Sequence, residues 1–156
     1  MISELMQARY RNDVAAVERL RMAGHVLDVH EAAAVGDDDR LRALLDQDPQ
    51  LVDAWSADGA QPLHFAAYFG HLPCVRLLLE HGADPRQHAH GFDEVAPINA
   101  AAASGPKPNE RCTELVRVLL EAGADPGAAQ GGGATALDTA RFTGNDELVA
   151  LLEMDS

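Results

Sequence analysis

Apolar residues along this chain come in short paired segments and not in long runs. The stretch PLHFAAYFGHLPCVRLLLEHGADP, residues 62 to 85, holds an alanine-rich segment, a Gly-His break, a leucine-rich segment and a final Gly-Ala-Asp-Pro. In the second segment, Val75 and residues 77–79 form an apolar stripe at helical spacing. The pattern predicts two short helices that are joined by a tight turn and followed by a loop.

Proline and glycine mark where these helices begin and end. Pro62 and Pro97 stand where a first helical residue is expected, and the missing N–H costs nothing there. Glycine ends helices readily because it adopts the left-handed conformation. The expected first helices end at Gly70, Gly105 and Gly144, and the expected second helices end at Gly82 and Gly123. The Asp-Pro pairs at 84–85 and 125–126 cannot continue a helix, so a loop must leave at each.

The same spacing of apolar, small and glycine positions returns along the chain. The frame Leu63, Ala66, Gly70, Val75, Leu78 and Gly82 falls, 58 residues earlier, on Leu5, Ala8, Asn12, Val17, Leu20 and Gly24. A shift of 34 residues toward the N-terminus gives Val29, Ala32, Gly36, Leu41, Leu44 and Asp48. Toward the C-terminus the frame matches Ile98, Ala101 and Gly105, then Val116, Leu119 and Gly123, and last Leu137, Ala140, Gly144, Val149 and Leu152.

One such unit cannot bury its apolar face alone, whereas stacked units can. We therefore expect a single all-α solenoid domain over 1–156, made of stacked helix-turn-helix units. Its expected parts are an N-terminal cap pair at 1–27, full repeats at 28–60, 61–94 and 95–134, and a C-terminal cap pair at 135–156. The third repeat carries an insertion near 106–111. Charged residues on both terminal pairs are typical of polar caps, which predicts a complete domain.

These residues resemble the ankyrin repeat family over essentially the whole chain. The resemblance is carried by Pro62-Leu63-His64, Ala66-Ala67, Gly70-His71, Leu77 to Leu79 and Gly82-Ala83-Asp84. It implies an L-shaped stack of helix pairs with hairpin-like loops along one edge, and a concave binding face lined by the loops and first helices. Gln61 and Ala96 stand where the family usually has Thr, and Asn99 and Asp138 where it has His. The loop at 86–95 is about two residues longer than usual.

Composition and charge restrict the partners that this chain can bind. The 156 residues carry a net charge of −13. Nucleic-acid binding draws its affinity from Lys and Arg contacts to phosphate, so this charge argues against nucleic acid and against anionic membranes. A protein partner with a basic surface fits better, and simple solubility is the alternative. Lys107 is the only lysine among 12 Lys and Arg residues, which together with the many alanines suggests a GC-rich bacterial genome.

The N-terminal sequence and the two cysteines indicate a cytoplasmic protein. Residues 1–20 have no long apolar core and no small-residue cleavage site, so they do not read as a signal peptide. No apolar run approaches the length of a membrane helix. Cys74 and Cys112 fall within helix-like segments and read as buried thiols, because two cysteines do not make a disulfide scaffold.

The aromatic residues point to the binding surface. In the repeat frame nearly all seven fall on the loops or on the first-helix face toward the groove, and few fall on the core stripe. Aromatic side chains dominate interface hot spots. The candidate partner-binding residues are Trp55, Asp58, Phe65, Tyr68, Phe69, His88, His90 and Phe92. The alternative is that Phe65 and Phe69 fill gaps between repeats, that Trp55 covers a loop, and that the acidic loop residues are only solvated.

A metal site is the main competing hypothesis. His88 and His90, with His81 and Asp84 nearby, could present two imidazoles on one side of an extended loop. No second pair of this kind follows, and His64 and His71 have structural roles that the family resemblance implies. The residues 130–133, Gln-Gly-Gly-Gly, lack the strand and the lysine of a phosphate-binding loop.

The sequence therefore favours a non-catalytic protein–protein interaction module that uses its concave face and loop tips. It needs no cofactor and is expected to be a monomer. The alternative function is a loop-borne metal or small-molecule site at His88 and His90. A third possibility is a spacer or self-associating unit, in which the exposed aromatic residues would form a dimer interface.

Overall fold

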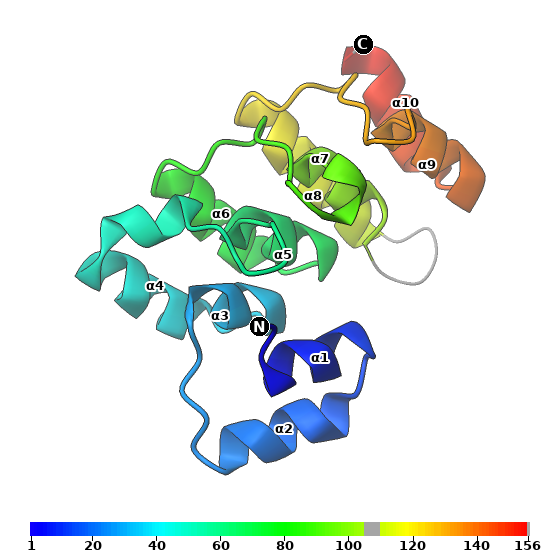
Figure 1. Cartoon of the computed structure of the whole chain (residues 1–156). Helices are drawn as coiled ribbons and strands as arrows, with labels where there is room; N and C mark the ends of the chain where they lie inside the picture. Colours follow the sequence, from blue (N-terminus) through cyan, green and yellow to red (C-terminus); the bar gives the residue numbers. More distant parts are fainter. Residues whose placement is uncertain (105–109, 156) are drawn as a thin grey trace.

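The computed structural model describes residues 1–104 and 110–155, which form ten α-helices arranged as stacked antiparallel pairs (Figure 1). The pairs are α1 (Glu4–Tyr10) with α2 (Val14–Met22), α3 (Val29–Val35) with α4 (Asp38–Gln47), α5 (Pro62–Tyr68) with α6 (Leu72–Glu80), α7 (Pro97–Ala102) with α8 (Glu110–Glu121), and α9 (Ala136–Thr143) with α10 (Asp146–Asp155). Two 3-10 turns, η1 (Pro49–Asp53) and η2 (Phe92–Glu94), lie in the connections. The predicted all-α solenoid is confirmed.

The first helices of the pairs form one row and the second helices another. In the first row α1, α3, α5, α7 and α9 each pack against the next, and in the second row α4, α6, α8 and α10 do the same. The chain termini consequently lie toward opposite ends of the stack (Figure 1). Each central pair is therefore held from both sides by its neighbours, as expected for a solenoid.

Small and branched apolar residues fill the interior according to their place in the repeat. Buried alanines of the first helices, such as Ala33, Ala67 and Ala101, allow neighbouring helices to approach closely. Leucines of the second helices, such as Leu78 and Leu119, supply the bulk of the core. The leucine-rich stripe read from the sequence therefore packs as predicted.

The predicted helix boundaries agree with the structure wherever it describes them. Pro62 and Pro97 are the first residues of α5 and α7. Gly144 ends α9 in the left-handed conformation, and Asn12 takes the same conformation at the equivalent position after α1, at φ 56°. Gly105 and most of the expected insertion at 106–111 lie outside the described residues.

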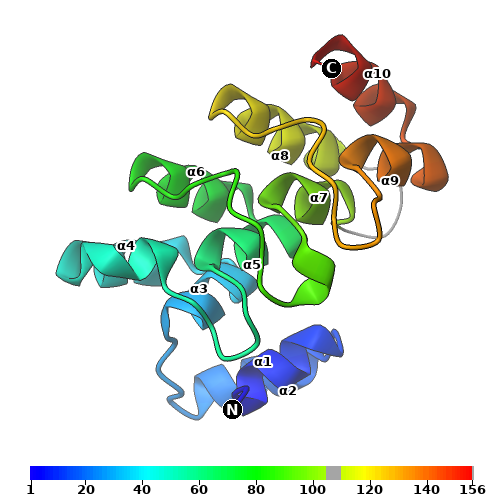
Figure 2. The ribbon, with the colours of Figure 1, turned by 45° about the horizontal axis from the view of Figure 1, so that its top comes forward.

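Hairpin-like loops connect α4 to α5, α6 to α7 and α8 to α9, and they project on the same side of the stack (Figure 2). In the first loop the Ser56 N–H donates to the Ala60 carbonyl at 2.8 Å, and in the second the Ala89 N–H donates to the Val95 carbonyl at 2.8 Å. In the third, Ala129 and Thr135 form an isolated antiparallel bridge. Within the described part of the chain, none of the helices is long and apolar enough to cross a membrane.

Candidate protein-binding site

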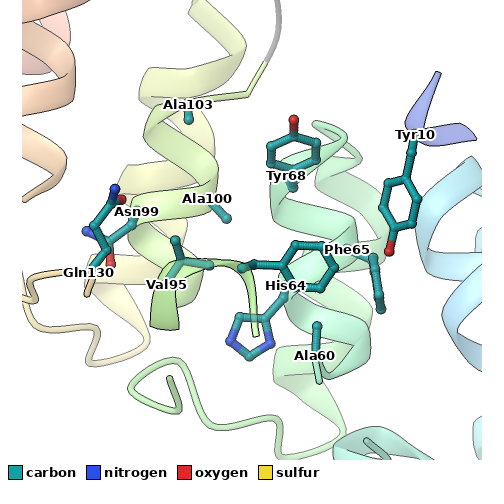
Figure 3. A pocket seen from close by; sticks show the side chains of 11 residues that line it. Tyr10, Ala60, His64, Phe65, Tyr68, Val95, Asn99, Ala100, Ala103 and Gln130 are labelled. Atoms are coloured by element: carbon teal, nitrogen blue, oxygen red, sulfur yellow. The ribbon is translucent and has the colours of Figure 1, made fainter. Parts of the chain in front are cut away.

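The groove between the loops and the first helices contains a pocket of about 300 Å³. Three first helices and three loops contribute to it, and Figure 3 shows these side chains. The lining residues are Tyr10, Ala60, His64, Phe65, Tyr68, Phe92, Val95, Asn99, Ala100, Ala103 and Gln130. Most of these side chains are apolar or aromatic, which is typical of ligand pockets. The stacking of repeats therefore builds the pocket from residues up to 120 positions apart in the chain.

Five aromatic residues form a connected cluster around the pocket. The Tyr10 ring lies 6.2 Å from that of Phe69 and 6.0 Å from that of Phe92, measured between centroids. The Phe65 and Phe92 rings are 6.2 Å apart, and those of Tyr68 and Phe69 are 5.0 Å apart, both edge to face. Edge-to-face pairs at such distances are stabilising. The structure thus brings together four of the residues predicted from the sequence and adds Tyr10.

Exposure separates the members of this aromatic cluster into surface and supporting residues. The Tyr68 and Phe92 side chains are 52% and 44% exposed and can contact a partner. The Phe69 ring is half-buried beneath the Arg9 guanidinium, whose carbon lies 4.2 Å from the ring centroid. A cation over an aromatic face is held electrostatically. Phe69 therefore offers only part of its ring to the groove.

Phe65 lies deeper in the protein than its place in the repeat frame suggested. It is only 4% exposed and belongs to the buried core, although part of its ring lines the pocket. The His30 ring covers one edge at 5.8 Å, and Phe92 approaches from the groove side. The helical spacing placed Phe65 and Tyr68 on one face, but α5 has α3 beside it, so only its C-terminal end stays open. Phe65 therefore fills a gap between repeats, the alternative that the sequence left open.

The first two loop tips are joined by a ring stack. The Trp55 and His90 rings lie 3.6 Å apart at an interplanar angle of 16°. Trp55 remains 39% exposed, so the pair presents a flat surface to solvent. The sequence singled out both residues but did not predict that they contact each other. They form a second candidate contact area beside the pocket.

His88 and His90 have separate interactions. The His88 Nδ1 pairs with the Glu94 carbonyl at 2.6 Å, while the His90 imidazole stacks on Trp55. Among the described residues, no group of three or more His, Cys, Asp or Glu side chains is placed to hold a metal ion. The structure thus uses the two imidazoles to shape the second loop.

Asp58 connects the first loop to α1. The Tyr10 hydroxyl donates to Asp58 Oδ2, and the Ser56 hydroxyl donates to Asp58 Oδ1. Burial, the hydrogen bond and the Asp58 charge all raise the pKa of Tyr10, so its hydroxyl stays protonated. Tyr10 was not among the predicted site residues. The signal that could have found it is its alignment with Tyr68 at the 58-residue shift.

The loop turn at 92–94 adopts a strained conformation. Phe92, Asp93 and Glu94 have φ values of 53°, 58° and 55°, in the left-handed region. Such residues cost roughly 1–3 kcal/mol each and persist when their surroundings fix them. The Gly131 N–H donates to the Asp93 carbonyl at 2.6 Å, and the Gln130 side chain donates to the Asp93 carboxylate at 3.2 Å. The third loop therefore fixes the turn that carries Phe92.

His64 and Asn99 are buried polar residues whose hydrogen bonds are directed into the protein. The His64 Nδ1 accepts from the Gln61 N–H at 3.1 Å, and its Nε2 donates to the Gln87 carbonyl at 2.8 Å. Burial is the main cause that lowers the pKa of His64, so the imidazole is neutral near pH 7.

Asn99 in α7 makes the same kinds of hydrogen bond as His64 in α5. Its amide oxygen accepts from the Ala96 N–H at 2.9 Å, and its amide nitrogen donates to the Ala128 carbonyl at 2.9 Å. The departure from the repeat pattern at Asn99 therefore keeps the same two contacts, one to its own turn and one to the next loop.

Comparison with known proteins agrees with this architecture. A family model described as ankyrin repeats (3 copies) matches residues 5–89 and 29–130. The chain is 35% identical over 129 residues to the mouse ankyrin repeat and SAM domain-containing protein 6, covering 80% of this chain and 14% of that protein.

Two further relatives match this chain over fewer residues. A Caenorhabditis elegans homologue of transient receptor potential cation channel subfamily A member 1 is 32% identical over 123 residues, covering 78% of this chain and 9% of that protein. The human DNA-binding protein RFXANK is 35% identical over 79 residues, covering 51% of this chain and 30% of that protein. The chain thus spans less than a third of the length of each of these relatives. Their names describe three different kinds of protein. The family model covers more than half of the chain, and the chain therefore belongs to the ankyrin repeat family.

Proposed function

We propose that the chain is a non-catalytic module that binds another protein through its groove and first two loop tips. The contact surface consists of Tyr68, Phe92 and Tyr10 at the pocket, with Phe69 beside them, and of the Trp55–His90 stack. The observation that carries the proposal is the exposure of two aromatic rings, Tyr68 and Phe92, at the mouth of an apolar pocket.

The physical basis of this function is a surface that is formed before the partner arrives. Each repeat is held by its neighbours, and the aromatic rings are fixed by contacts to one another. A rigid surface loses little conformational entropy on docking, so more of the contact energy appears as affinity. Buried aromatic anchors then provide most of the binding free energy.

Charge supports a partner with a basic surface. The chain carries a net charge of −13, and Asp58, Asp93 and Glu94 lie on the first two loops. Complementary charges speed encounter and exclude wrong partners more than they add affinity. The human relative is named a DNA-binding protein, but a net charge of −13 disfavours direct contact with phosphates.

The test is a comparison of two exposed aromatic residues at equivalent repeat positions. Tyr68 lies at the pocket, whereas Phe142, 74 residues later, is 92% exposed at the end of α9. Partners captured from the native host by the unmodified protein are identified, and their affinities for the Tyr68→Ala and Phe142→Ala variants are measured. We expect Tyr68→Ala to weaken binding by at least ~1 kcal/mol and Phe142→Ala to leave it unchanged. Equal affinities for both variants would contradict the proposed surface.

A further inference from the structure

We propose that the pocket receives one large apolar side chain of the partner protein, and that a Lys or Arg beside it in the partner's sequence meets Asp58 or Asp93. This inference rests on the function proposed above and specifies the chemistry of its ligand.

The walls of the pocket select for an apolar group. Eight of the eleven lining residues are apolar or aromatic, the exceptions being His64, Asn99 and Gln130. His64 and Asn99 already direct both polar atoms of their side chains to backbone groups. A polar group entering here would lose its hydrogen bonds to water and find few replacements, whereas an apolar side chain gains by leaving water.

The rim of the pocket is acidic on two sides. Tyr10 and Gln130 lie at opposite sides of the pocket (Figure 3). Tyr10 is hydrogen-bonded to the Asp58 carboxylate, and Gln130 to the Asp93 carboxylate. Each carboxylate therefore sits next to a lining side chain, one at each side. A cation that extends from either flank of an inserted apolar residue would meet a negative charge.

The residues that line the pocket do not offset the negative charge of the Asp58 and Asp93 carboxylates at its rim. Among the described residues that line it, none is an arginine or a lysine. The nearby Arg9 guanidinium lies over the Phe69 ring, and its Nε donates to the Ala34 carbonyl at 3.0 Å. The lining side chains themselves thus supply no positive charge to balance the Asp58 and Asp93 carboxylates at the rim, and an acidic apolar segment would not complement them.

The strained turn at 92–94 gives the pocket a fixed wall. A left-handed conformation at three consecutive non-glycine residues is maintained by the hydrogen bonds of Asp93 to Gly131 and Gln130. Strain of this kind is found at binding sites where it holds a side chain in place. Here it holds Phe92 against Tyr10 and Phe65, so contacts within the chain fix this wall of the cavity.

The experiment uses short peptide probes on the full chain, followed by amide resonances in NMR titrations. The probes are N-acetyl-Phe-Arg-amide, N-acetyl-Phe-Glu-amide and N-acetyl-Ala-Arg-amide. We expect the Phe-Arg probe to shift resonances of pocket residues and to bind about fivefold more tightly than the Phe-Glu probe, because an exposed ion pair contributes modestly. The Ala-Arg probe should give no saturable shift. Equal binding of the Phe-Arg and Phe-Glu probes would refute the charge component.

Two variants test the location. Ala103 lines the pocket at an exposed position after α7, so Ala103→Trp should fill the cavity without disturbing the core and abolish Phe-Arg binding. Phe92→Ala removes one wall of the pocket and should weaken binding of the Phe-Arg probe at least about tenfold. Unchanged binding in both variants would place the probe elsewhere and overturn the inference. Partner capture tests the proposed function separately. If a captured partner binds Tyr68→Ala more weakly but the peptide probes do not bind, only the present inference is refuted.

Discussion

The helices α2 and α6 occupy equivalent places in their repeats but have very different surroundings. The 58-residue shift aligns Val17 with Val75 and Leu20 with Leu78. In α6, Val75 and Leu78 are fully buried because α4, α5 and α8 pack around them. In α2 only Ala16 and Val17 are buried, Leu20 is half-buried, and Met22 is largely exposed. The same residues thus contribute differently because α2 lies at the end of the stack.

Polar interactions attach the N-terminal pair where apolar burial is limited. Glu31 on α3 is 2% exposed and accepts from the Ser3 hydroxyl at 2.5 Å, from the Asp28 N–H at 2.9 Å and from His25 Nε2 at 3.0 Å. Ser3 precedes α1 and His25 follows α2, so one carboxylate holds both ends of the pair. The centre of the molecule is therefore stabilised by apolar stacking, and its N-terminal end also by a buried charge.

The largest predicted effect compares the two aligned leucines. Leu78→Ala leaves a cavity between three helices and should lower the free energy of unfolding by ~2–5 kcal/mol. Leu20→Ala removes the same atoms from a half-buried site, so we expect about 1 kcal/mol or less. Chemical denaturation followed by circular dichroism measures both. Equal losses would show that the end of the stack is packed as tightly as its centre.

The second prediction concerns the buried carboxylate. Glu31→Ala removes the carboxylate that accepts hydrogen bonds from Ser3, His25 and the Asp28 N–H. Because these three donors lose their acceptor, the free energy of unfolding should fall by ~1–3 kcal/mol. Glu18→Ala on the exposed surface of α2 serves as the control and should change stability by less than about 0.5 kcal/mol. In Glu31→Ala, amide hydrogen exchange should become faster first in α1 and α2. Faster exchange spread evenly over α6 and α8 would contradict a local role.

The fold could be predicted from the sequence because its determinants are local and repeat. Pro62, Gly144 and the alanine and leucine positions each act within one helix or against the equivalent residue of the next repeat. The position of Tyr68 at the groove followed from the same frame. The burial of Phe65 could not be read from the sequence because it depends on His30 from another repeat, which helical spacing alone does not show.

The details of the candidate site could not be predicted because they depend on contacts between loops. The left-handed turn at 92–94 lies in the loop that is longer than the repeat pattern, and Phe-Asp-Glu carries no glycine to indicate it. The Trp55–His90 stack joins residues 35 positions apart, and Tyr10 reaches Asp58 across 48. Such pairs become neighbours only after the repeats stack.

The pH dependence of stability should also distinguish the two regions. Burial alone raises the pKa of Glu31, but the hydrogen bonds from Ser3, Asp28 and His25 outweigh it and hold the pKa below the ordinary value of 4.5. A lowered pKa in the folded state stabilises the protein fully above the unfolded value, and this stabilisation is lost as pH falls through the folded value. The unmodified protein should therefore lose more stability below about pH 4.5 than Glu31→Gln, with faster exchange in α1 and α2. Parallel pH profiles for the two proteins would exclude this carboxylate as the cause.

The smallest predicted effect tests how α1 is joined to the first loop. Tyr10→Phe keeps the ring and its contacts with Phe69 and Phe92 but removes the hydrogen bond to Asp58. Because Asp58 still accepts from Ser56, the loss should be only about 0.5–1.5 kcal/mol, seen by denaturation and by exchange in α1. Tyr68→Phe provides the matched control, since the structure gives that exposed residue its ring contact with Phe69 but no such bond to Asp58 among the described residues. If Tyr10→Phe and Tyr68→Phe behave alike, the rings and not the hydroxyl hold α1 against the loop, and the N-terminal pair would resemble the centre of the stack more closely than its polar contacts indicate.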